Sequence, residues 1–111
     1  MPHPRLSDDG TTVTLDLHGA AVDEGLRLVR RAAALAAARG RTTLRVVHGA
    51  STSDPRARNR TLKHALHDLL ASGSLPEAQS TFPAEGFTLI GLHLGARRDP
   101  TPIRLVDLAR P

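Results

Sequence analysis

Leu15-Asp16-Leu17-His18-Gly19 ends one alternating stretch of this sequence, and Arg45-Val46-Val47-His48-Gly49 ends a second stretch further along. Both stretches finish in the pair His-Gly. If they are parallel strands joined by a helix, both histidines lie at one edge of a sheet, where open α/β folds bind their ligands. Two histidines at such an edge, in a chain rich in arginine, predict a site for phosphate chemistry.

The first half of the chain has the pattern of a strand, a helix and a second strand. Residues 11–17 and residues 42–47 alternate apolar and polar side chains, as half-buried strands do. Between them, residues 21–39 carry apolar side chains at spacings of three and four, and Gly40 follows as a C-terminal cap. This order predicts a right-handed unit with two parallel strands.

The second half predicts another helix over 54–72, then β-like segments over 78–82, 87–94 and 103–108. No helical pattern separates these segments, so neighbouring ones are expected to pair antiparallel. Two helices cannot cover both faces of such a sheet. The sequence therefore predicts an α/β fold: a two-layer βαβαββ sandwich with a mixed sheet, both helices on one face, and room for an additional C-terminal strand over 103–108.

Length and composition limit the classes of protein. The 111 residues fit one domain, predicted over 12–109 after a flexible lead-in over 1–11. The formal charge is +4, and all but one of the 15 cationic residues are arginine, which favours phosphate ligands. The alternative is that a GC-rich genome supplies the arginines. The absence of cysteine excludes disulfides, thiolate metal sites and a thiol nucleophile.

The sequence indicates neither a membrane protein nor an aromatic nucleic-acid platform. Residues 1–12 lack the apolar core of a secretory signal, and the longest apolar run, 32–38, is too short to span a bilayer. A cytoplasmic protein without a membrane partner is expected. Phe82 and Phe87 are the only aromatic residues of the Phe, Tyr and Trp class. That number argues against modules that bind single strands by stacking bases on rings.

The two His-Gly stretches resemble the Smr (small MutS-related) domain family. The hallmark of that family is Leu-Asp-Leu-His-Gly at the end of the first strand, which residues 15–19 match without change. A second strand ending in apolar-apolar-His-Gly corresponds to residues 46–49, and the family's next helix begins with a pattern that residues 62–66 match. The family continues His-Gly with a further glycine, whereas here Ala50 and Ser51 follow Gly49.

The resemblance implies a fold like the C-terminal domain of a translation initiation factor, nucleic-acid binding, and endonuclease activity on DNA or RNA. In the family, the Asp-x-His of the first motif is tied to cleavage and the glycine loop to substrate contact. Those roles would fall on Asp16 and His18, and on His48 and Gly49, respectively. The expected partner is RNA or DNA, including structured or branched forms, and a larger nucleic-acid machine would recruit the domain.

The chemistry of phosphodiester cleavage leads to the same residues. Histidine can act as base or acid near neutrality, and Asp16 can orient the ring of His18. Basic residues near the edge would hold the phosphates. The predicted catalytic residues are Asp16, His18 and His48, and the predicted nucleic-acid-binding residues are Gly19, Arg45, Gly49, Ser51, Arg56, Arg58, Arg60 and Lys63. No cofactor is expected, and the need for a divalent metal is left open.

Each of these residues also has a structural interpretation. His18 can hydrogen-bond a strand end, Asp16 can bind nearby backbone N–H groups, and His48 can be a buried or turn histidine. His64, His67 and Asp68 are spaced on one predicted helix as metal ligands can be, but a solvated surface is the preferred interpretation. At the level of function, the alternatives are a non-catalytic module that grips phosphates or branched structures, and a binder of small phosphorylated molecules.

Overall fold

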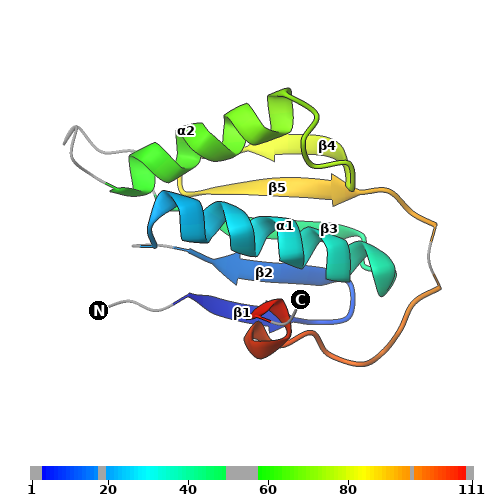
Figure 1. Cartoon of the computed structure of the whole chain (residues 1–111). Helices are drawn as coiled ribbons and strands as arrows, with labels where there is room; N and C mark the ends of the chain where they lie inside the picture. Colours follow the sequence, from blue (N-terminus) through cyan, green and yellow to red (C-terminus); the bar gives the residue numbers. More distant parts are fainter. Residues whose placement is uncertain (1–3, 18–19, 50–57, 96, 110–111) are drawn as a thin grey trace.

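The structure, a computed structural model, describes residues 4–17, 20–49, 58–95 and 97–109 (Figure 1). Within these residues, five strands form one sheet in the order β1-β2-β3-β5-β4. The strands are β1 (Arg5–Asp8), β2 (Thr12–Asp16), β3 (Thr43–Val47), β4 (Ala78–Pro83) and β5 (Phe87–Leu92). The helical elements are α1 (Val22–Ala38), α2 (Arg58–Ala71) and the short 3-10 helix η1 (Leu105–Ala109).

The sheet is mixed, as the sequence predicts. Strands β2 and β3 run parallel on either side of α1 in the chain, while β1, β4 and β5 pair with their neighbours in the antiparallel sense. Both α1 and α2 lie against the same face of the sheet (Figure 1). In the part of the chain that the structure describes, no helix covers the opposite face. The predicted two-layer α/β arrangement is therefore confirmed.

The core lies between the helices and the sheet. The strands supply alternate residues to it and the helices supply one stripe each, as their spacing predicts. Gly25 of α1 allows the two helices to approach closely, because a Cβ atom at this position would lie 2.8 Å from Cδ1 of Leu62 on α2. The fully buried apolar side chains include Val13, Leu15, Leu44, Val46 and Ile90 of the sheet, and Val29, Ala33, Ala36 and Leu66 of the helices.

The additional strand lies at the N-terminal side rather than the C-terminal side. Residues 5–8, expected as part of a lead-in, form β1 and pair with β2, with Arg5 opposite Asp16. The prediction of a strand over 103–108 was wrong, because this segment contains the 3-10 helix η1. The edge beside β2 is already occupied by β1. Ile103 and Leu108 instead bury their side chains from a segment that packs on α1 and β1.

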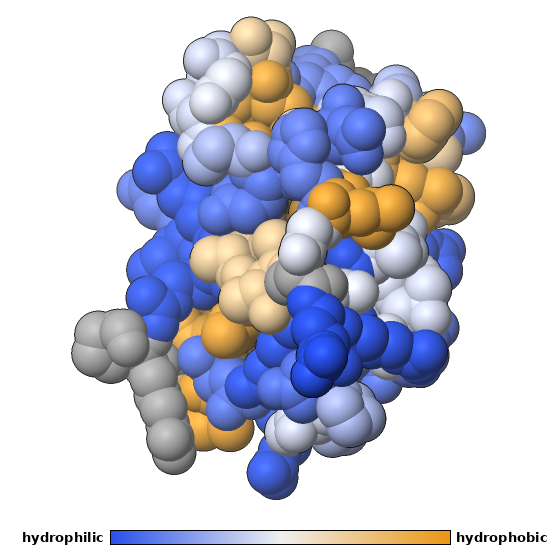
Figure 2. Space-filling view, turned by 90° about the vertical axis from the view of Figure 1, so that its right-hand side faces the viewer, coloured by the Kyte–Doolittle hydropathy of each residue, from blue (hydrophilic) through white to orange (hydrophobic). Residues whose placement is uncertain are grey.

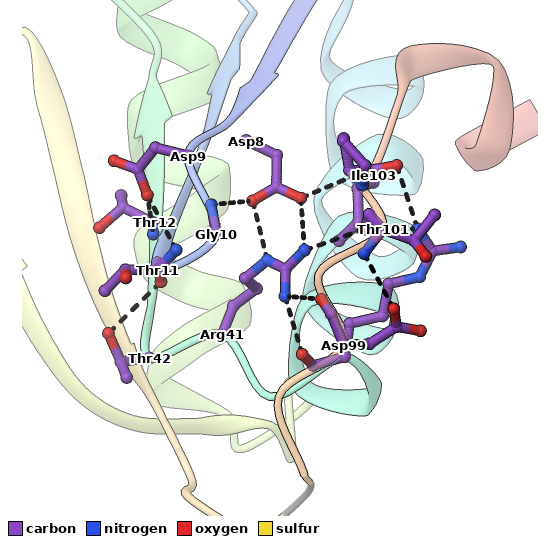
Figure 3. Close-up of polar contacts among 12 residues, drawn as sticks. Asp8, Asp9, Gly10, Thr11, Thr12, Arg41, Thr42, Asp99, Thr101 and Ile103 are labelled. Carbon is purple, nitrogen blue, oxygen red and sulfur yellow. Dashed lines mark hydrogen bonds and ion pairs between the residues drawn. The ribbon is translucent and has the colours of Figure 1, made fainter.

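A buried ion pair between Asp8 and Arg41 connects β1 to the segment that contains η1 (Figure 3). Nε of Arg41 donates to a carboxylate oxygen of Asp8 at 2.8 Å, and both side chains are almost fully buried. The same guanidinium donates to the backbone carbonyls of Arg39, Asp99 and Thr101. Asp8 in turn accepts from the backbone N–H of Ile103 at 2.8 Å. One arginine thus fastens β1 and the C-terminal segment to the end of α1.

The environment of Asp8 strongly favours its charged form. Burial alone would raise the pKa of its carboxyl, but hydrogen bonds from Arg41 and from the backbone N–H groups of Ile103 and Gly10 lower that pKa to about 2. A carboxylate that accepts several such bonds is stabilised as an anion. The pair is therefore charged at any pH at which the protein is expected to work.

The surface at this end of the sheet is strongly polar. Figure 2 faces the end at which β1 turns into β2, and hydrophilic residues gather there in a dark-blue patch in the lower half of the view. Smaller apolar areas lie above it. Among the described residues, no helix combines the length and the apolar character needed to cross a bilayer.

Candidate functional site

The ends of β2 and β3, which precede the two His-Gly pairs in the sequence, lie side by side. Asp16 pairs with Val47 in the parallel register, and the N–H of Leu17 donates to the Val47 carbonyl at 2.7 Å. Gly49 adopts φ of +88°, which favours glycine because a side chain there would be strained. The predicted parallel pairing of the two strands is confirmed, whereas the placement of His18 and Gly19 stays a prediction because both lie outside the described residues.

Asp16 lies on the face of the sheet that α1 and α2 leave uncovered. Its position alternates with Leu15 and Leu17, which are fully buried on the helix side. On the uncovered side, Asp16 lines an open hollow of about 330 Å³ together with Arg5, Ser7, Thr14 and the edge of Leu6. A carboxylate and an arginine therefore face solvent in one depression, next to the edge where β2 ends.

His48 lies on the opposite side of the sheet, toward the helices. Its ring is fully buried, with Nδ1 at 2.9 Å from the Gly49 carbonyl oxygen and Nε2 at 3.0 Å from Oγ1 of Thr88. A carbonyl can only accept, so Nδ1 carries the proton. In the neutral ring Nε2 is then an acceptor, and the Thr88 hydroxyl donates to it. Both nitrogens of His48 are thus occupied by the protein itself.

The Thr88 hydroxyl also connects His48 to helix α2. Nε2 of His67 lies 3.4 Å from Oγ1 of Thr88, and the two imidazole rings meet edge to face with centroids 6.4 Å apart. Because Thr88 gives its proton to His48, it can accept a hydrogen bond from His67. Burial lowers the pKa of His48, and the nearby Lys63 and His67 lower it further against the opposing effect of the Gly49 bond. The neutral ring is the stable form at neutral pH.

The predicted catalytic residues are therefore not all brought together. Asp16 and His48 end adjacent strands but face opposite sides of the sheet. His18 lies outside the described residues. A catalytic role for His48 stays a prediction, and its enclosed ring favours an indirect role over contact with a phosphate.

The predicted basic residues occupy different places. Arg45 is exposed on the uncovered face, with its guanidinium carbon 4.4 Å from the centre of the Phe87 ring. Lys63 lies on the helix side, and its Nζ donates to the Glu85 carbonyl at 3.3 Å between β4 and β5. Arg58 and Arg60 belong to the first turn of α2, with side chains outside what the structure describes. Gly19, Ser51 and Arg56 also lie outside the described residues.

Three residues of this region were missed by sequence analysis. Thr88 had a detectable signal, because it is a hydroxyl in a core position that alternates with Ile90 and Leu92, and a buried hydroxyl needs a partner. Arg5 had none, since the strand that carries it was not predicted. Phe87 entered only as one of two aromatic residues, a number judged too small for a base-stacking module. No group of three metal-ligating side chains forms among the described residues, which include His64, His67 and Asp68.

Comparison with known proteins adds independent information. The pattern of the Smr domain family matches residues 15–86. Among solved structures, the chain is similar to the Smr domain of Thermus thermophilus MutS2, with 30% sequence identity and a TM-score of 0.58. That similarity covers 72% of this chain and 96% of the other. Among curated proteins, no significant match is found.

Proposed function

Since the chain belongs to the Smr domain family, a family of nucleic-acid-binding modules, we propose that it binds nucleic acid and cleaves phosphodiester bonds where β2 ends. The observation that carries the proposal is the position of Asp16. This residue of the family motif lies in an open hollow beside Arg5, on a face that a long polyanion can reach. The endonuclease step goes beyond what family membership establishes.

In the proposed reaction, His18 transfers protons and Asp16 orients its ring. On RNA, the base takes the proton of the 2′-hydroxyl, the 2′-oxygen forms a bond to phosphorus, and the bond from phosphorus to the 5′-oxygen breaks. The base is the neutral ring of His18, and the 5′-oxygen then receives a proton from the imidazolium that this step forms, either directly or through water. On DNA, an activated water must supply the attacking oxygen. Arg5 and Arg45 on the same face would stabilise the negative charge that grows on the phosphate oxygens.

For His48 we propose a positioning role. Its Nδ1–H holds the Gly49 carbonyl, and the backbone N–H groups of His48 and Gly49 both donate to the Gly86 carbonyl, at 3.2 and 3.0 Å. These bonds fix the point at which the chain leaves β3. In this proposal Gly19, Gly49, Ser51 and Arg56 contact phosphates, and Arg58, Arg60 and Lys63 on α2 add positive charge.

A cleavage assay tests the proposal. Labelled single-stranded RNA, duplex DNA and branched DNA are incubated with the protein, with and without a chelator. We expect Asp16→Asn and His18→Ala to retain binding and to cut at least tenfold more slowly, as loss of a general acid or base typically costs. Arg30→Ala, an exposed change on α1, is the matched control and should cut normally. Equal cutting by His18→Ala and the unaltered protein would show a contaminating nuclease or another mechanism.

A binding titration tests the phosphate contacts separately. Arg58→Ala should weaken binding to all probes and reduce the slope of log affinity against log salt by about one unit, as loss of one phosphate contact does. If affinity is indifferent to salt, the assignment of the basic residues on α2 fails.

A second candidate function is binding without cleavage. One observation favours it, the enclosure of His48. Both ring nitrogens of this residue are hydrogen-bonded within the protein, so one of the two histidines predicted to transfer protons is already engaged. A pure binder would cut none of the three probes in any preparation and would still show the salt dependence described above.

A further inference from the structure

The uncovered face of the sheet carries its side chains in two ordered rows. In the row next to the end of β2, the register aligns Arg5, Asp16, Val47 and Phe87 across four strands. The next row aligns Ser7, Thr14, Arg45, Leu89 and Phe82 across all the strands of the sheet. Charged groups thus lie in the β1–β3 part of the face, and aromatic and apolar groups lie on β5 and β4.

Arg45 and Phe87 form a preassembled flat surface between these parts. The guanidinium carbon lies 4.4 Å from the ring centre, the geometry of a cation–π contact, and the Arg45 side chain is exposed. A guanidinium that already rests on a ring presents a planar, positively charged outer side. Nucleic-acid bases stack on aromatic rings and on arginine planes alike.

Phe82 provides a second surface on the same face. Thr81 borders a hollow beside His67 of α2, so the adjacent residue on β4 points to the opposite, uncovered side. The register confirms this side, since Phe82 pairs with Leu89. The Phe82 side chain is 61% exposed, which is unusual for a residue of this size. An exposed aromatic ring beside a cationic plane needs a partner that offers both flat apolar groups and negative charge.

We propose that this surface, formed by Phe82, Phe87, Leu89 and Arg45 and called here the stacking face, binds single-stranded nucleic acid. Bases stack on Phe82 and on the Arg45–Phe87 pair, while Arg45 and Arg5 neutralise phosphates. The inference rests on the proposed nucleic-acid function and assigns it a substrate class. It departs from the expectation drawn from the number of aromatic residues, because the register places both phenylalanines on the uncovered face.

The position of the stacking face relative to Asp16 supports this assignment. Phe87 and Asp16 share a row and are separated by β3 alone, so two strand spacings of about 4.8 Å each divide them. A base held at Phe87 would place a neighbouring phosphate near the hollow at Asp16. A duplex offers no unstacked base to such a surface, whereas a single strand offers one at every nucleotide.

A second copy of this chain fits the face less well. Two stacking faces meeting about a twofold axis perpendicular to the strands would bring Arg45 and Arg5 of one copy toward the like charges of the other, and an axis parallel to the strands would set these arginines against the apolar side chains of β4 and β5. Like charges facing each other across an interface disfavour association. A polyanion meets the same arginines with opposite charge.

The test compares binding to single strands and to a duplex. Probes of about 12 nucleotides, a length within the usual range for single-strand sites, are oligouridylate, oligothymidylate, a matched duplex and a strand without bases. Fluorescence anisotropy is measured in the cold, and intact probe is verified on a gel. The variants are Phe82→Ala and Arg45→Lys. The matched controls are Leu94→Ala, 73% exposed and two residues beyond the end of β5, and Arg30→Lys on α1.

We expect Phe82→Ala and Arg45→Lys each to weaken binding to both single strands roughly tenfold, as loss of one base stack does. Arg45→Lys keeps the charge but loses the plane. Binding to the duplex and to the strand without bases should change less than twofold, and the controls should behave as the unaltered protein. Single-strand affinities that survive both substitutions, or that fall equally for the strand without bases, would overturn the stacking face.

The outcome is separable from that of the cleavage assay. If Phe82→Ala weakens single-strand binding and no preparation cuts, the stacking face stands and the nuclease proposal falls. If the protein cuts in an Asp16-dependent manner and Phe82→Ala binds normally, the reverse holds. If Phe82→Ala changes only the sedimentation of a dimer, the face is a protein interface and the proposal is wrong.

Discussion

The hydroxyl of Thr88 lies 3.0 Å from Nε2 of His48, and both side chains are fully buried. This contact decides the state of the imidazole. With Nδ1 donating to the Gly49 carbonyl, His48 needs a donor at Nε2, and Thr88 is that donor. The end of β3 is therefore held by a neutral histidine, and the stability of the site depends on a hydroxyl supplied by β5.

Replacing Thr88 by valine should destabilise the fold. The change keeps the shape but leaves an acceptor of His48 buried without a partner, at a cost of about 1–3 kcal/mol in the free energy of unfolding. Urea denaturation measures this cost. Thr14→Val, on the uncovered face, is the control and should change stability far less. A Thr88→Val protein as stable as the original would mean that the hydroxyl contributes nothing.

Acidification should destabilise the protein through His48. Its pKa is lowered in the folded state by burial, so below the unfolded value of 6.5 the unfolded chain binds the proton more readily. The contribution of His48 is thus fully present above pH 6.5 and is lost as the pH falls below it, by at most about 1.4 kcal/mol per pH unit.

The measurement is the free energy of unfolding in urea at several pH values between neutrality and mild acid. His48→Asn should be less stable at neutral pH but should show a shallower decline on acidification. The same slope in both proteins would show that other groups cause the decline.

Breaking the buried pair of Asp8 and Arg41 should be costly. Asp8→Asn leaves a buried guanidinium without its counter-charge, which typically destabilises by about 3–5 kcal/mol. The double variant Asp8→Leu with Arg41→Met should be less destabilised than the sum of the single variants Asp8→Leu and Arg41→Met, because no charge remains buried. Thermal and urea unfolding of the four proteins form the required cycle. Simple additivity would argue against a coupled pair.

The same pair should govern stability in strong acid. The pKa of Asp8 is about 2 in the folded protein against 3.8 for the free group, so its contribution is present above pH 3.8 and is lost as the pH falls toward 2. The expected loss in the free energy of unfolding is roughly 2 kcal/mol. Acid titration of the folded fraction checks this, and Asp8→Asn should lack that part of the transition.

Two glycines with the same backbone conformation allow a matched comparison. Gly40 and Gly73 end α1 and α2, each with φ of +74°. Alanine at Gly73 meets nothing within 4 Å, so only the backbone strain of about 1–2 kcal/mol is expected. Alanine at Gly40 would place Cβ 2.7 Å from Cα of Arg98, and a further loss is expected. Equal destabilisation of the two variants in urea would show that the segment at Arg98 moves away freely.

The elements with clear periodicity could be predicted from sequence. Alternation over β2 and β3 and the three- and four-residue spacing of α1 reflect burial of one face, which a short window of sequence displays. β1 has a single apolar residue, Leu6, and depends on pairing with β2 and on Asp8, which bonds a residue far along the chain. Such partners are invisible to local patterns. The segment of Ile103 and Leu108 looked like a strand because its apolar spacing suits either structure.

The candidate site was predictable in position but not in orientation. The two His-Gly motifs indicated the edge of the sheet where β2 and β3 end. The alternation that buries Leu44 and Val46 also places His48 on the helix side, opposite Asp16. The number of aromatic residues likewise says nothing of where they lie. What matters for Phe82 and Phe87 is that the register of β4 and β5 places both on one face, and register depends on pairing between strands.

The bonds of Arg41 have a practical consequence for anyone who trims this protein. Of the groups that its guanidinium contacts, only the Arg39 carbonyl falls within residues 15–86, the span that the family pattern covers. Asp8, Asp99 and Thr101 all lie beyond those limits. A fragment cut to the shared span would leave Arg41 with one of these partners and would also lack β1 and β5, so expression boundaries for this protein belong outside residues 5–109.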